Sequence, residues 1–212
     1  KKNAQPHKKQ KGHIQKACCR WKMGFSIPDE MKTIILDPGH GMSNRRSGRY
    51  DPGAVNGDYT EAEIVMDWAN VLREVLMSRG YRVIRTRVDA KDPAPIGQRA
   101  SIARKYGGEI MLSLHCNAAN GRASGTETFY RGAENKAKAQ RITDAVCAVL
   151  ETRNRGAKTE ASSQHSRLAV MSFQPCFLLE IGFIDNAPDL AKMIDPAYRR
   201  RACNVLADIL TA

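Results

Sequence analysis

The sequence predicts an α/β protein built on a mostly parallel β-sheet with helices on both faces. Over almost the whole chain, short apolar runs typical of strands alternate with longer segments whose apolar residues recur every three or four positions, as in helices. Two apolar runs, residues 33–36 and 109–115, lead into His40 and His115. Because ligands collect at the carboxyl ends of strands in open α/β sheets, we expect the functional site at that edge.

The composition is that of a globular protein. The chain has 212 residues, of which 42% are hydrophobic and 26% charged. No apolar run approaches the roughly 18 residues of a membrane-spanning helix. The formal net charge of +12 favours encounters with polyanions without identifying them. The basic residues at the start of the chain lack the interleaved aromatic residues of a nucleic-acid-binding surface, apart from Trp21, so we predict no specific nucleic-acid partner.

The charge distribution separates the two ends of the chain. Residues 1–30 hold eight of the 34 Lys and Arg residues but only two acidic ones, and we predict a basic, disordered extension there. Residues 31–212 are predicted to form a single folded domain. The extension has no uninterrupted apolar stretch after its basic residues, so we expect no signal peptide and synthesis in the cytoplasm. The six cysteines show no disulfide framework, which fits a reducing compartment.

The first predicted strand, residues 33–36, is short, apolar and β-branched. Pro38 cannot extend it, and the glycines on either side of His40 allow a tight turn that presents the imidazole. Residues 42–58 are rich in turn-forming side chains, and a loop of this length inside a compact domain is often functional.

A helix is predicted to follow this loop. Thr60 and Glu63 form a capping box, with Thr60 as the N-cap. Apolar residues at positions 64, 65, 68, 72, 75 and 76 form a one-sided stripe, and Gly80 ends the helix. Glu61 has no capping role. The helix N-terminus favours its ionised form, which is the form that a metal ion requires.

Further strands are predicted at residues 81–86, 109–115, 125–130, 168–171 and 175–181, and further helices at residues 95–106, 134–152 and 196–210. Residues 154–167 are predicted to form a polar, basic loop in which His165 is a solvated residue. We interpret Arg99, in the second helix, as a surface charge.

Three side chains at this edge have the chemistry of a catalytic metal site. His40, Glu61 and His115 form a three-ligand set of the kind that binds zinc and leaves a fourth position for water. Nitrogen and oxygen ligands favour zinc over a metal that prefers thiolates. The three residues are far apart in the sequence, so this prediction requires the sheet to bring them together.

Glu180 lies within an apolar strand, where an ionised carboxylate is costly without a partner. Beside a metal-bound water it would have a chemical role. It could take a proton from the water and deliver it to a leaving nitrogen.

Five ordered motifs carry a resemblance to a known family. They occupy residues 31–41, 60–61, 113–118, 125–130 and 179–186. From residue 31 to about residue 210 the chain resembles the zinc-dependent N-acetylmuramoyl-L-alanine amidases of the amidase-3 type. The resemblance implies a phosphorylase/hydrolase-like fold with a twisted, mixed, mostly parallel sheet of about six strands. It also implies Zn²⁺ bound by His40, Glu61 and His115, with Glu180 as the catalytic acid/base.

The same resemblance implies the substrate. The family cleaves peptidoglycan at the amide between the lactyl group of N-acetylmuramic acid and L-alanine of the stem peptide. Asn117 is expected either to contact this substrate or to make only a turn hydrogen bond. Without a recognised signal or wall-binding repeat, a phage or prophage endolysin that reaches the cell wall after release fits best, and a sporulation amidase is the second choice.

Two alternatives remain open at this point. A zinc carboxypeptidase or endopeptidase with the same fold would act on a different bond. A non-catalytic wall-binding domain would use the positive charge alone. The sequence does not predict an oligomeric state.

Overall fold

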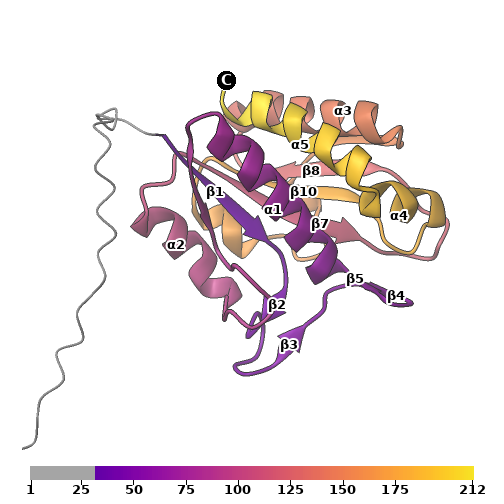
Figure 1. Ribbon diagram of the computed structural model, residues 1–212, viewed down its shortest axis with the longest axis horizontal. Coiled ribbons are helices and arrows are strands. Elements are labelled where there is room, and N and C mark those ends of the chain that lie inside the picture. Colours follow the sequence, from indigo (N-terminus) through magenta and orange to yellow (C-terminus); the bar gives the residue numbers. More distant parts are fainter. Residues whose placement is uncertain (1–31) are drawn as a thin grey trace, which may run out of the picture.

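The computed structural model describes residues 32–212 (Figure 1). The predictions about residues 1–30, namely the disordered extension and the missing signal peptide, therefore concern residues outside that range, as does the predicted domain start at Met31. Among residues 32–212, no helix combines the length and apolarity needed to cross a membrane.

A six-stranded sheet runs through the domain in the order β6-β1-β7-β10-β8-β9. Its strands are β1 (Thr33–Pro38), β6 (Arg82–Arg85), β7 (Ile110–Asn117), β8 (Thr126–Tyr130), β9 (Asn154–Thr159) and β10 (Cys176–Phe183). Neighbouring strands are parallel except β8 and β10, which are antiparallel. The predicted mixed, mostly parallel sheet of about six strands is confirmed.

Helices pack on both faces, as predicted, but unequally (Figure 1). One face carries α1 (Glu61–Ser78), α3 (Lys136–Leu150), α4 (Ala187–Ile194) and α5 (Pro196–Leu210). The other face is covered in part by α2 (Arg99–Lys105) and the 3₁₀ helix η4 (Ala169–Ser172). Further 3₁₀ helices are η1 (Ile96–Gln98), η2 (Ala133–Asn135) and η3 (Glu160–Ser162).

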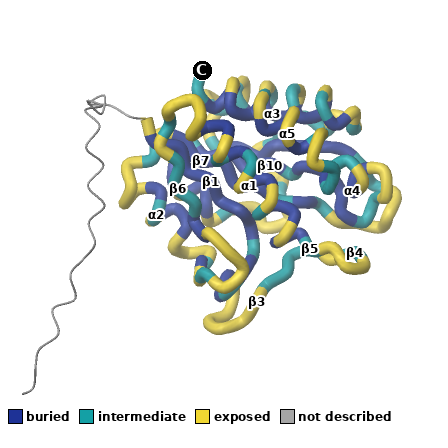
Figure 2. The backbone as a smooth tube through the Cα atoms, in the orientation of Figure 1, coloured by how far each residue is buried: buried dark blue, intermediate teal, exposed yellow. Residues whose placement is uncertain are grey.

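Strand alternation divides the core into two clusters. Leu36, Leu114 and Leu179 point toward the larger cluster under α1, α3 and α5, where Trp68 is fully buried. The central strands β1, β7 and β10 are buried along most of their length (Figure 2). The residue after each of these leucines points to the opposite face, which has the smaller apolar cluster. These following residues are Asp37, His115 and Glu180. The polar residues of the strand ends thus share the sparsely covered face.

The start of α1 forms as the sequence predicts. Thr60 is the N-cap, and its Oγ1 accepts a hydrogen bond from the backbone N–H of Glu63 at 3.3 Å. The same hydroxyl donates to Glu63 Oε2 at 2.7 Å. Positions 64, 65, 68, 72, 75 and 76 are all buried, which confirms the apolar stripe.

Three predicted segments differ in type from the structure, and helix α4 was not predicted. Strand β9 lies within the predicted loop 154–167. Strand β9 lies at the edge of the sheet, where polar residues are common, so its sequence has no apolar pattern that would predict a strand. Residues 168–171 were predicted as a strand but contribute to η4, since apolar runs this short do not distinguish a strand from a helical turn. The long loop before α1 contains four two-residue strands, namely β2 (Gly41–Met42), β3 (Tyr50–Asp51), β4 (Val55–Asn56) and β5 (Tyr59–Thr60).

Candidate active site

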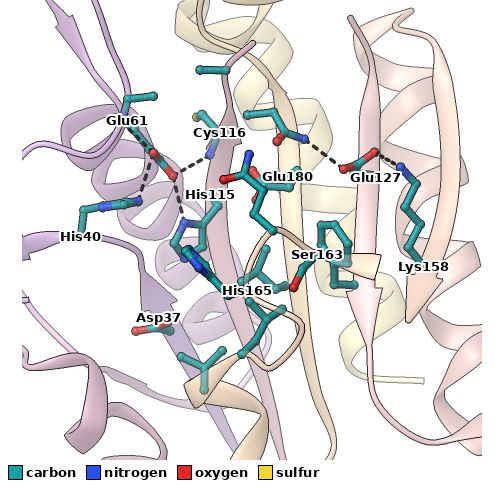
Figure 3. Close-up of a pocket in the computed structure, with 18 of the residues that line it drawn as sticks. Asp37, His40, Glu61, His115, Cys116, Glu127, Lys158, Ser163, His165 and Glu180 are labelled. Carbon is teal, nitrogen blue, oxygen red and sulfur yellow. Dashed lines mark hydrogen bonds and ion pairs between the residues drawn. The ribbon is translucent and has the colours of Figure 1, made fainter. Parts of the chain in front are cut away.

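Two strand ends and one helix start bring His40, Glu61 and His115 together (Figure 3). His40 Nε2 lies 3.1 Å from Glu61 Oε2, and His115 Nδ1 lies 2.9 Å from Glu61 Oε1. The candidate ligand atoms of all three residues lie within 4.8 Å of one another. This group of donors can hold a metal ion, and it is formed by residues 21 and 54 positions apart in the sequence.

The turn after β1 is shaped around the two imidazoles. His40 has a φ of 59°, in the left-handed region that few non-glycine residues adopt, and Gly41 follows with a φ of 94°. A side chain at Gly39 would meet the His115 ring, because a Cβ there would lie 2.4 Å from its Cε1 atom. Only glycine therefore allows β1 to approach His115 this closely.

Two arginines stabilise this turn by binding its carbonyl groups. Arg99 donates to the carbonyl oxygens of Pro38 at 2.9 Å and His40 at 2.6 Å. Arg87 donates to the carbonyl oxygens of Pro38 at 2.9 Å and Gly39 at 2.7 Å. Since buried carbonyl groups need donors, the two guanidinium groups compensate for the hydrogen bonds that the irregular backbone cannot make.

The prediction that Arg99 is a surface charge was wrong. Its side chain is 2% exposed and pairs with Asp37, which is fully buried, at 2.7 Å. Burial opposes ionisation of Asp37, but Arg99, Ser113 and Thr86 outweigh that effect and hold its pKa below the ordinary value. Asp37 was the signal that sequence reasoning missed, because a carboxylate inside an apolar strand requires a buried cation.

Glu61 is held ionised at the start of α1, where it is 4% exposed. Its Oε2 accepts the backbone N–H of Ala54 at 2.9 Å, and its Oε1 accepts the backbone N–H of Cys116 at 2.9 Å. Burial raises the pKa of Glu61, but hydrogen bonds with His115 and His40 oppose it and bring that pKa well below the ordinary value. The sequence prediction that Glu61 favours its charged form is consistent with these contacts.

Asp51, which the sequence reasoning did not single out, lies behind His40. Its Oδ2 is 3.2 Å from His40 Nδ1, the nitrogen that faces away from Glu61. Asn44 Nδ2 donates to Asp51 Oδ2 at 2.7 Å, and the Gly53 N–H donates to Oδ1 at 3.0 Å. This contact is an ion pair without hydrogen-bond geometry, and the negative charge of Asp51 favours a proton on Nδ1, which leaves Nε2 free as a ligand.

We expect Asp51→Asn to weaken metal binding by about 10- to 100-fold, because the imidazole loses the partner that selects its tautomer. Competition between the protein and a chromophoric zinc chelator measures the change. Asp58→Asn, an exposed substitution in the same loop, is the matched control and should leave the affinity unchanged. Equal affinities for wild type and Asp51→Asn would show that Asp51 does not position His40.

Glu180 points into the same cavity from β10 (Figure 3). It pairs in register with His115 on one side and with Glu127 on the other. Within the described chain, Glu180 Oε2 is buried without a hydrogen-bond partner. Burial, together with the nearby charges of Glu61 and Glu127, raises the pKa of Glu180 well above its ordinary value. A carboxyl group in this environment is suited to exchanging a proton with a bound ligand.

The other residues singled out from the sequence also line the cavity, which has a volume of about 580 Å³. Asn117 Nδ2 donates to Glu127 Oε1 at 3.2 Å, and its backbone carbonyl accepts the Ile184 N–H at 2.8 Å. His165 is exposed and lies outside the group of metal-donor residues. The sequence reasoning missed Glu127, Arg155 and Lys158, which also line the cavity.

The fold and this site together define an α/β protein with a cavity suited to a metal ion. Residues 34–212 match the family described as N-acetylmuramoyl-L-alanine amidase, and the chain belongs to that family. The predicted family is therefore confirmed.

Similar proteins support this assignment. The germination-specific N-acetylmuramoyl-L-alanine amidase of Bacillus subtilis is 31% identical over 201 residues, covering 87% of this chain and 80% of that protein. The N-acetylmuramoyl-L-alanine amidase LytC of Bacillus subtilis is 30% identical over 182 residues, covering 84% of this chain but only 34% of LytC. The catalytic domain of the amidase CwlV from Bacillus (Paenibacillus) polymyxa has a TM-score of 0.74 at 25% identity, covering 85% of this chain and 97% of that domain.

Proposed function

We propose that this chain cleaves peptidoglycan at the amide between N-acetylmuramic acid and L-alanine, using zinc held by His40, Glu61 and His115. The observation that carries the proposal is the convergence of these three donor groups, with Glu180 on the neighbouring strand facing the same cavity. Membership of the amidase family supports the choice of bond.

The residues present fit zinc. Two imidazole nitrogens and one carboxylate are a common catalytic zinc set. Glu61 is already in the ionised form that a cation requires. Cys116 is beside the site in sequence, but its thiol has a pKa raised by burial and its side chain belongs to the core of the opposite face. The donor atoms that gather together are therefore nitrogen and oxygen, which favours zinc over a thiolate-preferring metal.

The mechanism follows from where the protein groups lie. When bound, zinc supplies a Lewis acid that polarises the scissile carbonyl group and makes water a stronger acid. Glu180 accepts a proton from the attacking water at its unpartnered Oε2 atom and returns it to the alanine nitrogen as the C–N bond breaks. The products are the lactyl carboxylate and a peptide with a free alanine amino group.

Digestion of purified peptidoglycan tests the proposal. We expect new alanine amino groups without new reducing sugars, loss of this activity with a chelator, and its return on addition of zinc. New amino groups on other stem residues would instead indicate an endopeptidase or carboxypeptidase. Binding without any cleavage would indicate a wall-binding domain. Either result would contradict the proposal.

The biological setting remains a prediction. We propose a phage or prophage lysis enzyme as the first choice and a sporulation amidase as the second. Action on the bacterial wall follows from the proposed substrate.

A further inference from the structure

A row of polar residues crosses the sheet from the metal-donor site toward its far edge. His115 on β7 is in register with Glu180 on β10, and Glu180 is in register with Glu127 on β8. The next strand, β9, carries Arg155 and Lys158. Lys158 points toward Glu127 (Figure 3). All of these residues line the same cavity, so a substrate that crosses it from the cleavage site meets them in that order.

An irregularity in β9 brings both cations to Glu127. Thr126 pairs with Asn154 and Thr128 pairs with Ala157, so β9 has one more residue than β8 over this stretch. Gly156, with a φ of 77°, occupies the bulge. In a regular strand, residues 155 and 158 would point to opposite faces because their spacing is odd. The bulge allows both side chains to reach the same face.

The resulting cluster has an excess of positive charge. Arg155 Nε and Lys158 Nζ each lie 2.6 Å from the same oxygen of Glu127, Oε2. Glu127 is 5% exposed, whereas the Arg155 and Lys158 side chains are 26% and 32% exposed. One buried carboxylate therefore holds two cations in place, and both remain accessible from the cavity. The Arg155 guanidinium also lies 4.9 Å from the centre of the Phe183 ring, which restricts it further.

The distance between the cleavage site and the two cations suits the peptide part of the substrate. The charged groups of Arg155 and Lys158 contact Glu127 on β8, which is two strands from His115 on β7. Adjacent strands lie about 4.8 Å apart, so these groups lie about 10 Å from the metal-donor site. An extended peptide covers this distance in about three residues. A leaving peptide with a free carboxylate on its second residue would place that group beside the two cations, whereas the corresponding amide would carry no charge there.

We propose that Arg155 and Lys158 form a subsite for the carboxylate of the second stem residue, positioned by Glu127 and by the bulge at Gly156. This inference rests on the proposed function, because it assumes that the leaving group is the stem peptide. A bound carboxylate would balance the excess charge of the cluster with charge-assisted hydrogen bonds. The subsite would make the protein prefer stem peptides that carry the free acid over those that carry the amide.

Binding of the leaving peptide tests the subsite without requiring hydrolysis. We would titrate the zinc-loaded protein with L-alanyl-γ-D-glutamyl-L-lysine and with the same peptide carrying D-isoglutamine, using calorimetry. Wild type should bind the acid about tenfold more tightly or better, as expected for a charge-assisted contact. Lys158→Gln should remove this preference. It should lower the affinity for the acid peptide and leave the affinity for the amide peptide almost unchanged.

Lys158→Arg, which retains the charge, should keep the preference and thereby separate a binding role from a structural one. Lys192→Gln removes a lysine on α4 that does not line the cavity, and it should have no effect. Equal affinity of wild type for both peptides would overturn the inference. An equal loss of affinity for both peptides in Lys158→Gln would overturn it as well. Cleavage of muramyl peptides by wild type, measured separately, tests the proposed function alone.

Discussion

Glu180→Gln should lower peptidoglycan hydrolysis by about 100- to 10,000-fold, the range for removal of a general acid/base. Glutamine has nearly the same shape but cannot exchange a proton. Glu180 contributes none of the three gathered donor atoms, so zinc binding should persist. Release of alanine amino groups measures activity, and metal analysis of the purified variant measures zinc.

Glu74→Gln is the matched control, since Glu74 lies on the exposed side of α1 and pairs with Arg200 at 3.0 Å. It should retain wild-type activity. Substantial hydrolysis by Glu180→Gln would remove Glu180 from the reaction. Loss of zinc together with activity would instead make its role structural.

Arg99→Met should lower the free energy of unfolding by about 3–5 kcal/mol, the cost of leaving a buried charge without its partner. The variant leaves the Asp37 carboxylate without its cation and the His40 carbonyl group without its donor, and it leaves the Pro38 carbonyl group with Arg87 alone. Because those carbonyl groups belong to the turn that presents His40, zinc affinity should fall as well. Urea denaturation at neutral pH measures the stability change.

The loss of stability in Arg99→Met should depend on pH in a defined direction. The folded-state pKa of Asp37 is below its ordinary value of 3.8, so Asp37 stabilises the wild type above that pH and loses this contribution as the pH falls through the folded-state pKa. In Arg99→Met the carboxyl group can avoid its penalty by taking up a proton. The difference between variant and wild type should therefore shrink on acidification.

Two further variants complete this test. Arg104→Met, on the exposed side of the same helix, should change stability by no more than about 0.5 kcal/mol. The double variant Asp37→Asn/Arg99→Met should recover part of the loss, because no unpaired charge remains. If Arg99→Met proves as stable as wild type, the Arg99–Asp37 pair does not support the turn.

The family and the architecture were readable from the sequence because they depend on local patterns. Alternating strand and helix periodicity gave the α/β class, and the capping box at Thr60 located the start of α1. His40, Glu61 and His115 were recognisable as candidates because each occurs at a strand end or a helix start. Polar edge strand β9 had no such pattern, since its pairing depends on β8 rather than on its own residues.

Sequence alone therefore determined which side chains carry the proposed chemistry, because residue type sets what a group can donate, accept or ligate. Tertiary structure alone decided which groups support them. The supporting groups are Arg99, Asp51 and Lys158, and each contacts a residue that is not its neighbour in the sequence. These contacts therefore depend on packing and strand register. A long charged side chain has the same local signal on a surface as in a buried pair, and only the neighbours supplied by the fold distinguish the two.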